Sequence, residues 1–344
     1  TAVGPPYYRV MPFADILGQE KASSYLKQLV RNQKVPGALL FFGPDGVGKR
    51  LAALEFAKAL NCLDEDARRR GDACGVCANC RAIDKATHPD VTFVDFTYQA
   101  RLEVKKDFTS KGYAEELEKE ITKQQHISVD TIRDVTAKSQ QKAVGNGWKV
   151  LIIDQAQTMQ GAAANALLKF IEEPPYKTVW VLITNKRAAM LRTILSRCQP
   201  LAFSPLSLEN VKEILTRTQA NVTNPELCAK YSAGSVSGAV KAAEALDLLE
   251  AGGFGSPQGP SGVAAGLSRT LVTSRQEAQA VLDVLIMALH RAWIDETNEN
   301  KQCAYQTMLK RFENYKRSIG RNVSPALVLE TALMSLDGLN LQIF

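Results

Sequence analysis

Short apolar runs alternate with segments of helical periodicity from Ala38 to Phe203. Each run has the length of one strand and is rich in apolar residues, which favours a buried strand. Parallel strands covered by helices on both faces show such unbroken apolar runs, so the pattern predicts an α/β domain with a parallel sheet. The predicted strands are residues 38–43, 91–96, 148–154, 178–184 and 198–203, and a helix is expected at 49–60.

The strand pattern stops after Phe203. Short helical segments follow to about Leu249, and helical spacing returns from Ser268 onward. Between them, residues 251–263 are dense in glycine and proline, a composition that cannot bury a core and marks a linker or long loop. We therefore expect an α/β domain at 1–203, a small helical lid at 204–249, a linker at 250–267 and a C-terminal all-helical domain at 268–344.

Length and composition limit the class of protein. A chain of 344 residues is too long for one compact core and suits two or three domains. No apolar run approaches the ~20 residues that span a bilayer, and residues 1–9 contain no apolar signal core, so we expect a cytoplasmic protein without a membrane partner. The net charge of +6 is mild for a DNA-binding domain. Residues 101–125 are highly charged, and we expect an exposed inserted loop or helical excursion there.

A phosphate-binding loop is predicted directly after the first strand. Its sequence matches G-x-x-x-x-G-K, between a strand and a helix, which is the context that this motif requires. Glycines let backbone N–H groups turn toward phosphate oxygens, and the helix N-terminus and the lysine add positive charge. The candidate nucleotide-binding residues here are Gly43, Pro44, Asp45, Gly46, Val47, Gly48, Lys49 and Arg50.

Two positions depart from a hydrolysing site. A working loop carries Ser or Thr after the lysine as a ligand for Mg²⁺, whereas Arg50 offers only N–H donors and a positive charge. Asp154 ends an apolar strand, as in the second nucleotide motif, but the next residue is Gln155, which cannot act as a general base. The alternative is that Gln155 orients water, as a glutamine does in some GTPases. We expect phosphate contact without efficient hydrolysis.

Four of the seven cysteines form a cluster within residues 62–80. Four thiolates suit tetrahedral Zn²⁺ and leave no position for water, so the site is expected to be structural. A redox pair and an iron–sulfur cluster are the alternatives. An odd number of cysteines in a cytoplasmic chain argues against a disulfide framework. The predicted ligands are Cys62, Cys74, Cys77 and Cys80, and the other cysteines are Cys198, Cys228 and Cys303.

Several further stretches resemble one family. Residues 165–175, NALLKFIEEPP, are similar to the N-A-L-L-K-x-L-E-E-P-P sequence of bacterial sliding-clamp loaders, the AAA+ subunits of DNA polymerase III. Residues 195–199 contain the S-R-C sequence of that family, and residues 13–20 resemble the segment that lies near its adenine. Thr184 and Asn185 stand where the family carries its first sensor. The resemblance covers about residues 7–240.

The resemblance implies a role for each matching residue. In the family, the arginine of S-R-C, here Arg197, reaches the ATP site of the adjacent subunit, where a guanidinium fits the charge of the transferring phosphoryl group. Arg50 and Gln155, with Ser237 in place of a lid arginine, favour the non-hydrolysing delta-prime type, a rigid stator. Its implied partners are the motor subunits and the delta subunit, and indirectly the sliding clamp and primer–template DNA. The C-terminal domain would join the collar of the pentamer.

Two other functions are weighed against this one. The chain could be an active DNA-dependent ATPase, a gamma/tau-like motor subunit of the same complex, which intrinsic ATP turnover would reveal. It could instead be a zinc-containing module that binds nucleic acid by itself. The mild net charge argues against that reading, since such binding relies on many phosphate contacts.

Overall fold

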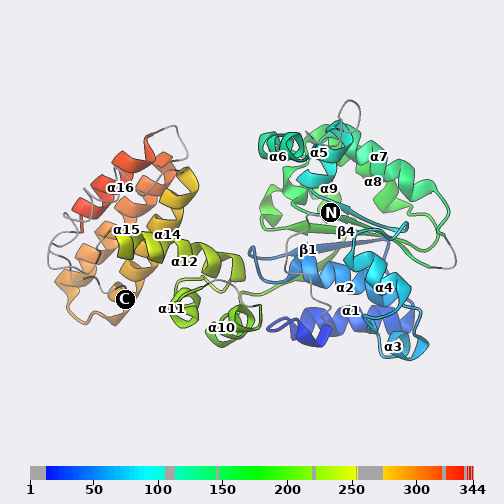
Figure 1. Ribbon diagram of the computed structural model, residues 1–344, viewed down its shortest axis with the longest axis horizontal. Helices are drawn as coiled ribbons and strands as arrows, with labels where there is room; N and C mark the ends of the chain where they lie inside the picture. Colours follow the sequence, from blue (N-terminus) through cyan, green and yellow to red (C-terminus); the bar gives the residue numbers. More distant parts are fainter. Residues whose placement is uncertain are drawn as a thin grey trace. The chain divides into compact units, whose positions relative to one another are not determined.

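The computed structural model describes residues 13–104, 113–144, 147–218, 222–252, 254, 274–319, 323–336, 339, 341 and 343. Contacts divide the chain into two compact units, Thr1–Leu206 and Ser207–Phe344 (Figure 1). Among the described residues, no helix is both long and apolar enough to cross a membrane.

A parallel sheet forms the centre of the first unit. All of its pairings are parallel, and the spatial order is β2-β3-β4-β1-β5. Every residue of β3 and β4 is buried, which explains why these two segments read as unbroken apolar runs. All the predicted strands are confirmed. Their bounds are β1 Ala38–Phe42, β2 Val91–Val94, β3 Lys149–Ile153, β4 Thr178–Thr184 and β5 Gln199–Ala202.

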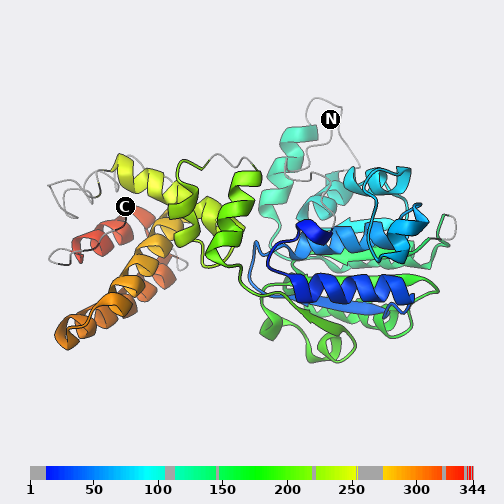
Figure 2. The same cartoon turned by 90° about the horizontal axis from the view of Figure 1, so that it is seen from below.

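Helices cover both faces of this sheet (Figure 1). The helices α1 and α2 lie on one face and stand in front of the strands in Figure 2, whereas α7 and α8 lie on the other. On the second face, Ile132 of α7 and Leu167 of α8 pack in one core with Leu151 and Trp180. The bounds are η1 Phe13–Asp15, α1 Glu20–Asn32, α2 Lys49–Asn61, α3 Glu65–Arg69, α4 Ala78–Asp84, α5 Phe96–Val104, α6 Tyr113–Lys123, α7 Val129–Gln140, η2 Ala156–Thr158, α8 Gly161–Glu172, η3 Arg187–Ala189 and α9 Arg192–Leu195.

The charged segment at 101–125 belongs to a pair of helices. The helix α5 extends through Val104, and α6 follows with no buried residue, so the helical alternative of the prediction is confirmed. Residues 105–112 lie outside the described part of the chain. Because α6 has an amphipathic pattern yet buries nothing fully, it is an exposed excursion rather than part of the core.

Among the described residues of the second unit, every element of regular secondary structure is a helix. Its long helix α12 is rich in alanine, and the buried alanines allow close approach to α14. Glu250 and Ala251 end α12, so the predicted linker at 250–267 begins too early, and most of the rest lies outside the described residues. The bounds are α10 Leu208–Arg217, α11 Pro225–Lys230, α12 Val236–Ala251, α14 Arg275–Asp295, α15 Glu299–Ile319 and α16 Pro325–Met334.

Candidate functional site

The predicted phosphate loop connects β1 to α2 at the carboxyl edge of the sheet. Gly43 has φ of 152°, and a Cβ there would lie 2.2 Å from the carbonyl oxygen of Phe203. Gly48 caps α2 in the left-handed region, with φ of 96°, and Gly46 has φ of 66°. These conformations are open to glycine and strained for other residues. Val47 is buried and anchors the loop.

Lys49 lies inside this loop. Only 5% of the residue is exposed, and its Nζ donates hydrogen bonds to the carbonyl oxygens of Gly43, at 2.8 Å, and of Pro44. The carboxylate of Asp45 is 4.0 Å away. Burial lowers the pKa of Lys49, while the charges of Asp45 and Asp154 act in the opposite direction. The ammonium group thus sits where phosphate oxygens would replace the loop carbonyls as its partners.

Arg50 points from the first turn of α2 toward two carboxylates. Its Nη2 lies 3.5 Å from Asp95 Oδ2 and its Nη1 lies 3.9 Å from Asp154 Oδ2. The guanidinium carbon stands 4.0 Å from the centroid of the Phe93 ring, within the range of a cation–π contact. Burial raises the pKa of Asp154, and the charge of Arg50 partly counters this rise.

Hydrogen bonds with the backbone hold Asp154 in position. Its N–H donates to the carbonyl of Val94 at 2.9 Å, and the N–H of Gln155 donates to its Oδ1 at 2.9 Å. Gln155 itself is exposed and has a left-handed φ of 49°. An amide neither accepts nor releases a proton near neutral pH, so a general base is absent at this position.

The residues at this edge do not fit a bound magnesium ion. In a hydrolysing loop, a hydroxyl after the lysine and an aspartate on the neighbouring strand hold Mg²⁺. Here Arg50 occupies the first position and is already paired with the aspartate. A guanidinium has no lone pair for a metal and repels it.

The two predicted sensor residues lie beside the loop at the end of β4. Thr184 is buried, its carbonyl accepts the N–H of Gly43 at 3.3 Å, and its Oγ1 accepts the N–H of Lys186 at 3.1 Å. Asn185 Nδ2 donates to Asp45 Oδ2 at 2.5 Å. The strand order therefore brings the loop, Asp154, Thr184 and Asn185 to a single edge.

Sequence reasoning missed three residues here. Asp95 and Phe93, the partners of Arg50, belong to the run at 91–96, which was recognised only as a strand. The guanidinium of Arg187 stacks 4.7 Å from the ring of Phe42. Polar residues that directly follow parallel strands gather at one edge, and this rule would have found Asp95.

Arg197 lies at the opposite edge of the sheet. It lies two residues before β5, whose first residue, Gln199, pairs with Leu39 near the start of β1. The phosphate loop follows the far end of β1, which is about 16 Å away at ~3.3 Å per residue. An arginine side chain is too short to cover this distance, so Arg197 is not available to phosphates in its own loop.

Neighbouring groups hold the guanidinium of Arg197. Its Nε is ion-paired with Glu172, and its Nη1 donates to Thr193 O at 3.0 Å and to Ser196 Oγ at 3.2 Å. Glu172, Ser196 and Arg197 line a depression of about 360 Å³. The depression is lined by Pro36, Gly37, Ala38, Ile171, Glu172, Pro174, Ser196, Arg197, Cys198 and Gln199.

The four predicted cysteine ligands come together beyond the end of α2. Their sulfur atoms all lie within 4.8 Å of one another, and none forms a disulfide. A metal at ~2.3 Å from each sulfur in a tetrahedron requires S···S spacings of about 3.8 Å, which is compatible with sulfur atoms gathered within 4.8 Å. Backbone N–H groups donate to three of the sulfurs at 3.3 to 3.5 Å. The residues therefore fit a four-thiolate metal site, made of Cys62, Cys74, Cys77 and Cys80.

Buried polar contacts attach this cysteine module to α2. Lys58, whose side chain is 2% exposed, pairs with Glu55 of the same helix and with Asp84 of α4, the latter at 2.9 Å. Asn79 Nδ2 donates to Asn61 O at 2.8 Å. Burial raises the pKa of Glu55 to about 7, although the charge of Lys58 lowers it in part. Lys58 thus compensates a carboxyl group that would otherwise be isolated in the interior.

Comparison with known proteins places these features in a family. Residues 18–207 match the family model described as DNA polymerase III, delta subunit. The chain is 33% identical to subunit delta' of Bacillus subtilis over 60% of its length and 56% of that protein. It is 36% identical to subunit delta' of Pseudomonas aeruginosa over 50% of its length and 45% of that protein. It is 30% identical to subunit tau of Bacillus subtilis over 71% of its length and 38% of that protein.

The chain therefore spans between 38% and 56% of the length of these relatives. A DNA polymerase III gamma subunit-related protein from Thermotoga maritima has a similar structure, with a TM-score of 0.54 and 18% identity over 90% of this chain and 97% of that one. At this identity the likeness concerns the fold alone, a parallel sheet with helices followed by a helical region. Because the family model matches more than half of its residues, this chain belongs to the DNA polymerase III delta-subunit family of clamp-loader proteins.

Proposed function

We propose that this chain is a delta-prime-type, non-hydrolysing subunit of a sliding-clamp loader, and that it supplies Arg197 to the ATP site of a neighbouring subunit. The observation that carries the proposal is the pairing of Arg50 with Asp154 and Asp95, since a cation of the chain itself stands where hydrolysis needs a metal. Gln155 supports the proposal independently, because a glutamine cannot act as the general base that hydrolysis needs at this position.

The position of Arg197 supports the second half of the proposal. An arginine at the amino edge of the sheet cannot act on its own loop, yet it borders an open depression at the surface. A neighbouring subunit that presents ATP to this edge would meet a guanidinium already oriented by Glu172 and Thr193. The remaining Nη2 could then donate to the transferring phosphoryl group.

We further infer that the metal of the cysteine module is Zn²⁺ with a structural role. Four thiolates fill a tetrahedral shell, so no open position remains for catalysis. The partners we propose are clamp-loader motor subunits and a delta subunit, with the sliding clamp and primed DNA reached through them, in the cytoplasm. The division of the second unit into a lid and a collar domain is part of the same proposal.

ATP turnover by the purified chain, alone and with primed DNA, tests the first half. We expect no turnover above background in either case. Turnover that Lys49→Ala abolishes would instead identify an active, gamma/tau-like motor subunit.

Reconstitution with candidate motor subunits tests the second half. Arg197→Ala should leave the chain folded and slow hydrolysis at the site it serves by about 10³-fold or more. Arg192→Ala, five residues earlier at the other end of α9, is the matched control and should have no effect. An unchanged rate with Arg197→Ala would remove the proposed role in trans.

A further inference from the structure

Two carboxylates, at the edge of the sheet where the strands end, share the guanidinium of Arg50. Asp95 and Asp154 follow the neighbouring strands β2 and β3, and Arg50 lies within 3.5 Å of the first and 3.9 Å of the second. The ring of Phe93 supports the guanidinium at 4.0 Å. A guanidinium is a planar group with several N–H donors, so it can contact both carboxylates at once.

A divalent ion would have to compete with that guanidinium. Like charges repel, and Arg50 offers no lone pair, so a metal could reach Asp154 only after Arg50 had left both carboxylates. A polyphosphate, in contrast, would be attracted by the positive charges here. Lys49 and Arg50 are consecutive at the amino end of α2, where backbone N–H groups also favour negative charge.

We propose that the loop at 43–49 binds a nucleoside di- or triphosphate as its metal-free anion, and that Arg50 supplies the positive charge that a divalent cation supplies in hydrolysing loops. The inference rests on the non-hydrolysing role proposed above, because cleavage is the step that needs the metal. It adds the form of the ligand and a binding role for Arg50. The nucleotide would then act as a fixed structural ligand of this subunit.

Calorimetric titration of the full chain with ADP and with ATP, once in excess EDTA and once in millimolar Mg²⁺, tests the proposal. For each nucleotide, we expect the Kd in EDTA and the Kd in Mg²⁺ to agree within about twofold. Lys49→Ala should abolish binding under both conditions, because it removes the lysine from the centre of the loop.

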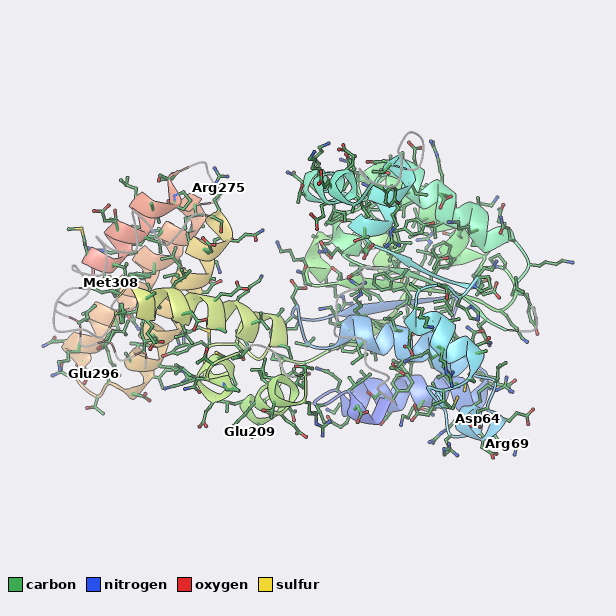
Figure 3. The ribbon with its side chains drawn as sticks, viewed as in Figure 1. Asp64, Arg69, Glu209, Arg275, Glu296 and Met308 are labelled. Carbon is green, nitrogen blue, oxygen red and sulfur yellow. The ribbon has the colours of Figure 1, made fainter. Side chains whose placement is uncertain are left out.

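Replacement of Arg50 should make binding depend on the metal. Arg50→Thr frees both carboxylates and adds a hydroxyl ligand, so affinity in EDTA should fall about tenfold or more, and Mg²⁺ should restore it. Arg69→Ala is the matched control, since Arg69 lies on the surface at α3 (Figure 3) with a side chain 76% exposed. It should bind as the wild type does under both conditions.

Two results would overturn the inference. One is wild-type protein that binds neither nucleotide in EDTA, and the other is wild-type affinity that Mg²⁺ raises tenfold or more. If Arg50→Thr fails to fold by circular dichroism, Arg50→Lys, which keeps the charge, serves in its place and should still bind in EDTA. Metal-dependent binding without turnover would defeat this inference alone, whereas turnover by the wild type would defeat the proposed function.

Discussion

The side chain of Asn61 links the phosphate-loop helix to the sheet. Its Nδ2 donates to Trp148 O at 3.0 Å, and its Oδ1 accepts from Trp148 N at 2.8 Å. The same Nδ2 donates to Ala57 O at 3.2 Å. Asn61 is buried at the end of α2, directly before the first cysteine of the module. The side-chain amide of Asn61 therefore makes hydrogen bonds with the backbone just before β3, as a neighbouring strand would.

Asn61→Ala leaves the N–H and C=O of Trp148 without these partners. Trp148 is half-buried, and a net hydrogen bond contributes about 0.5–1.5 kcal/mol, so the loss of both bonds should lower the unfolding free energy of the first unit by about 1–3 kcal/mol. Asn79→Ala is the matched control. It removes a single neutral hydrogen bond to Asn61 O instead of the two that reach Trp148, and should cost about 1 kcal/mol or less.

Urea unfolding followed by tryptophan fluorescence measures both losses. Trp148 and Trp180 belong to the first unit and Trp293 to the second, so a Trp293→Phe background confines the signal to the first unit. The protein should be saturated with metal throughout. A loss for Asn61→Ala no larger than that for Asn79→Ala would refute the reasoning, because water would then replace the carboxamide at no net cost.

Three further predictions concern the metal, a buried carboxyl and the paired arginine. Chelation of the metal should lower the Tm of the first unit, because four thiolates lose their shared cation; an unchanged Tm in calorimetry would contradict a structural metal. Burial raises the pKa of Glu55 to about 7, above its unfolded value, so its contribution to stability is full below the unfolded pKa and is lost as the pH rises through 7. Glu55→Gln should abolish this fall in urea titrations from pH 5 to 8, and parallel curves would count against it. Glu172→Ala should slow hydrolysis by the reconstituted complex about tenfold, less than Arg197→Ala, while Glu172→Gln keeps most of the rate because its amide oxygen still accepts from Nε; equal rates for both variants would argue against positioning by Glu172.

Much of the first unit could be predicted because its signals are local. The runs that form β3 and β4 are the clearest case, since a strand buried on both faces has to be apolar along almost its whole length. The predicted lid ends at 249, two residues before α12 ends at Ala251, because local sequence specifies the boundary of a helix less sharply than its interior. The pairing of Lys58 with Asp84 was not predictable, because Asp84 lies on another helix and nothing in its local sequence indicates an ion pair.

The sequence by itself determined the class of fold, the phosphate loop, the cysteine cluster and the loss of a hydroxyl at Arg50, because each depends on residue type and short spacing. The tertiary structure alone decided which groups meet. The order of strands places Asp95 and Asp154 side by side around Arg50 and leaves Arg197 at the other edge of the sheet. The physical reason is that pairing between distant strands fixes these distances, and pairing depends on the packing of the whole sheet rather than on any one segment.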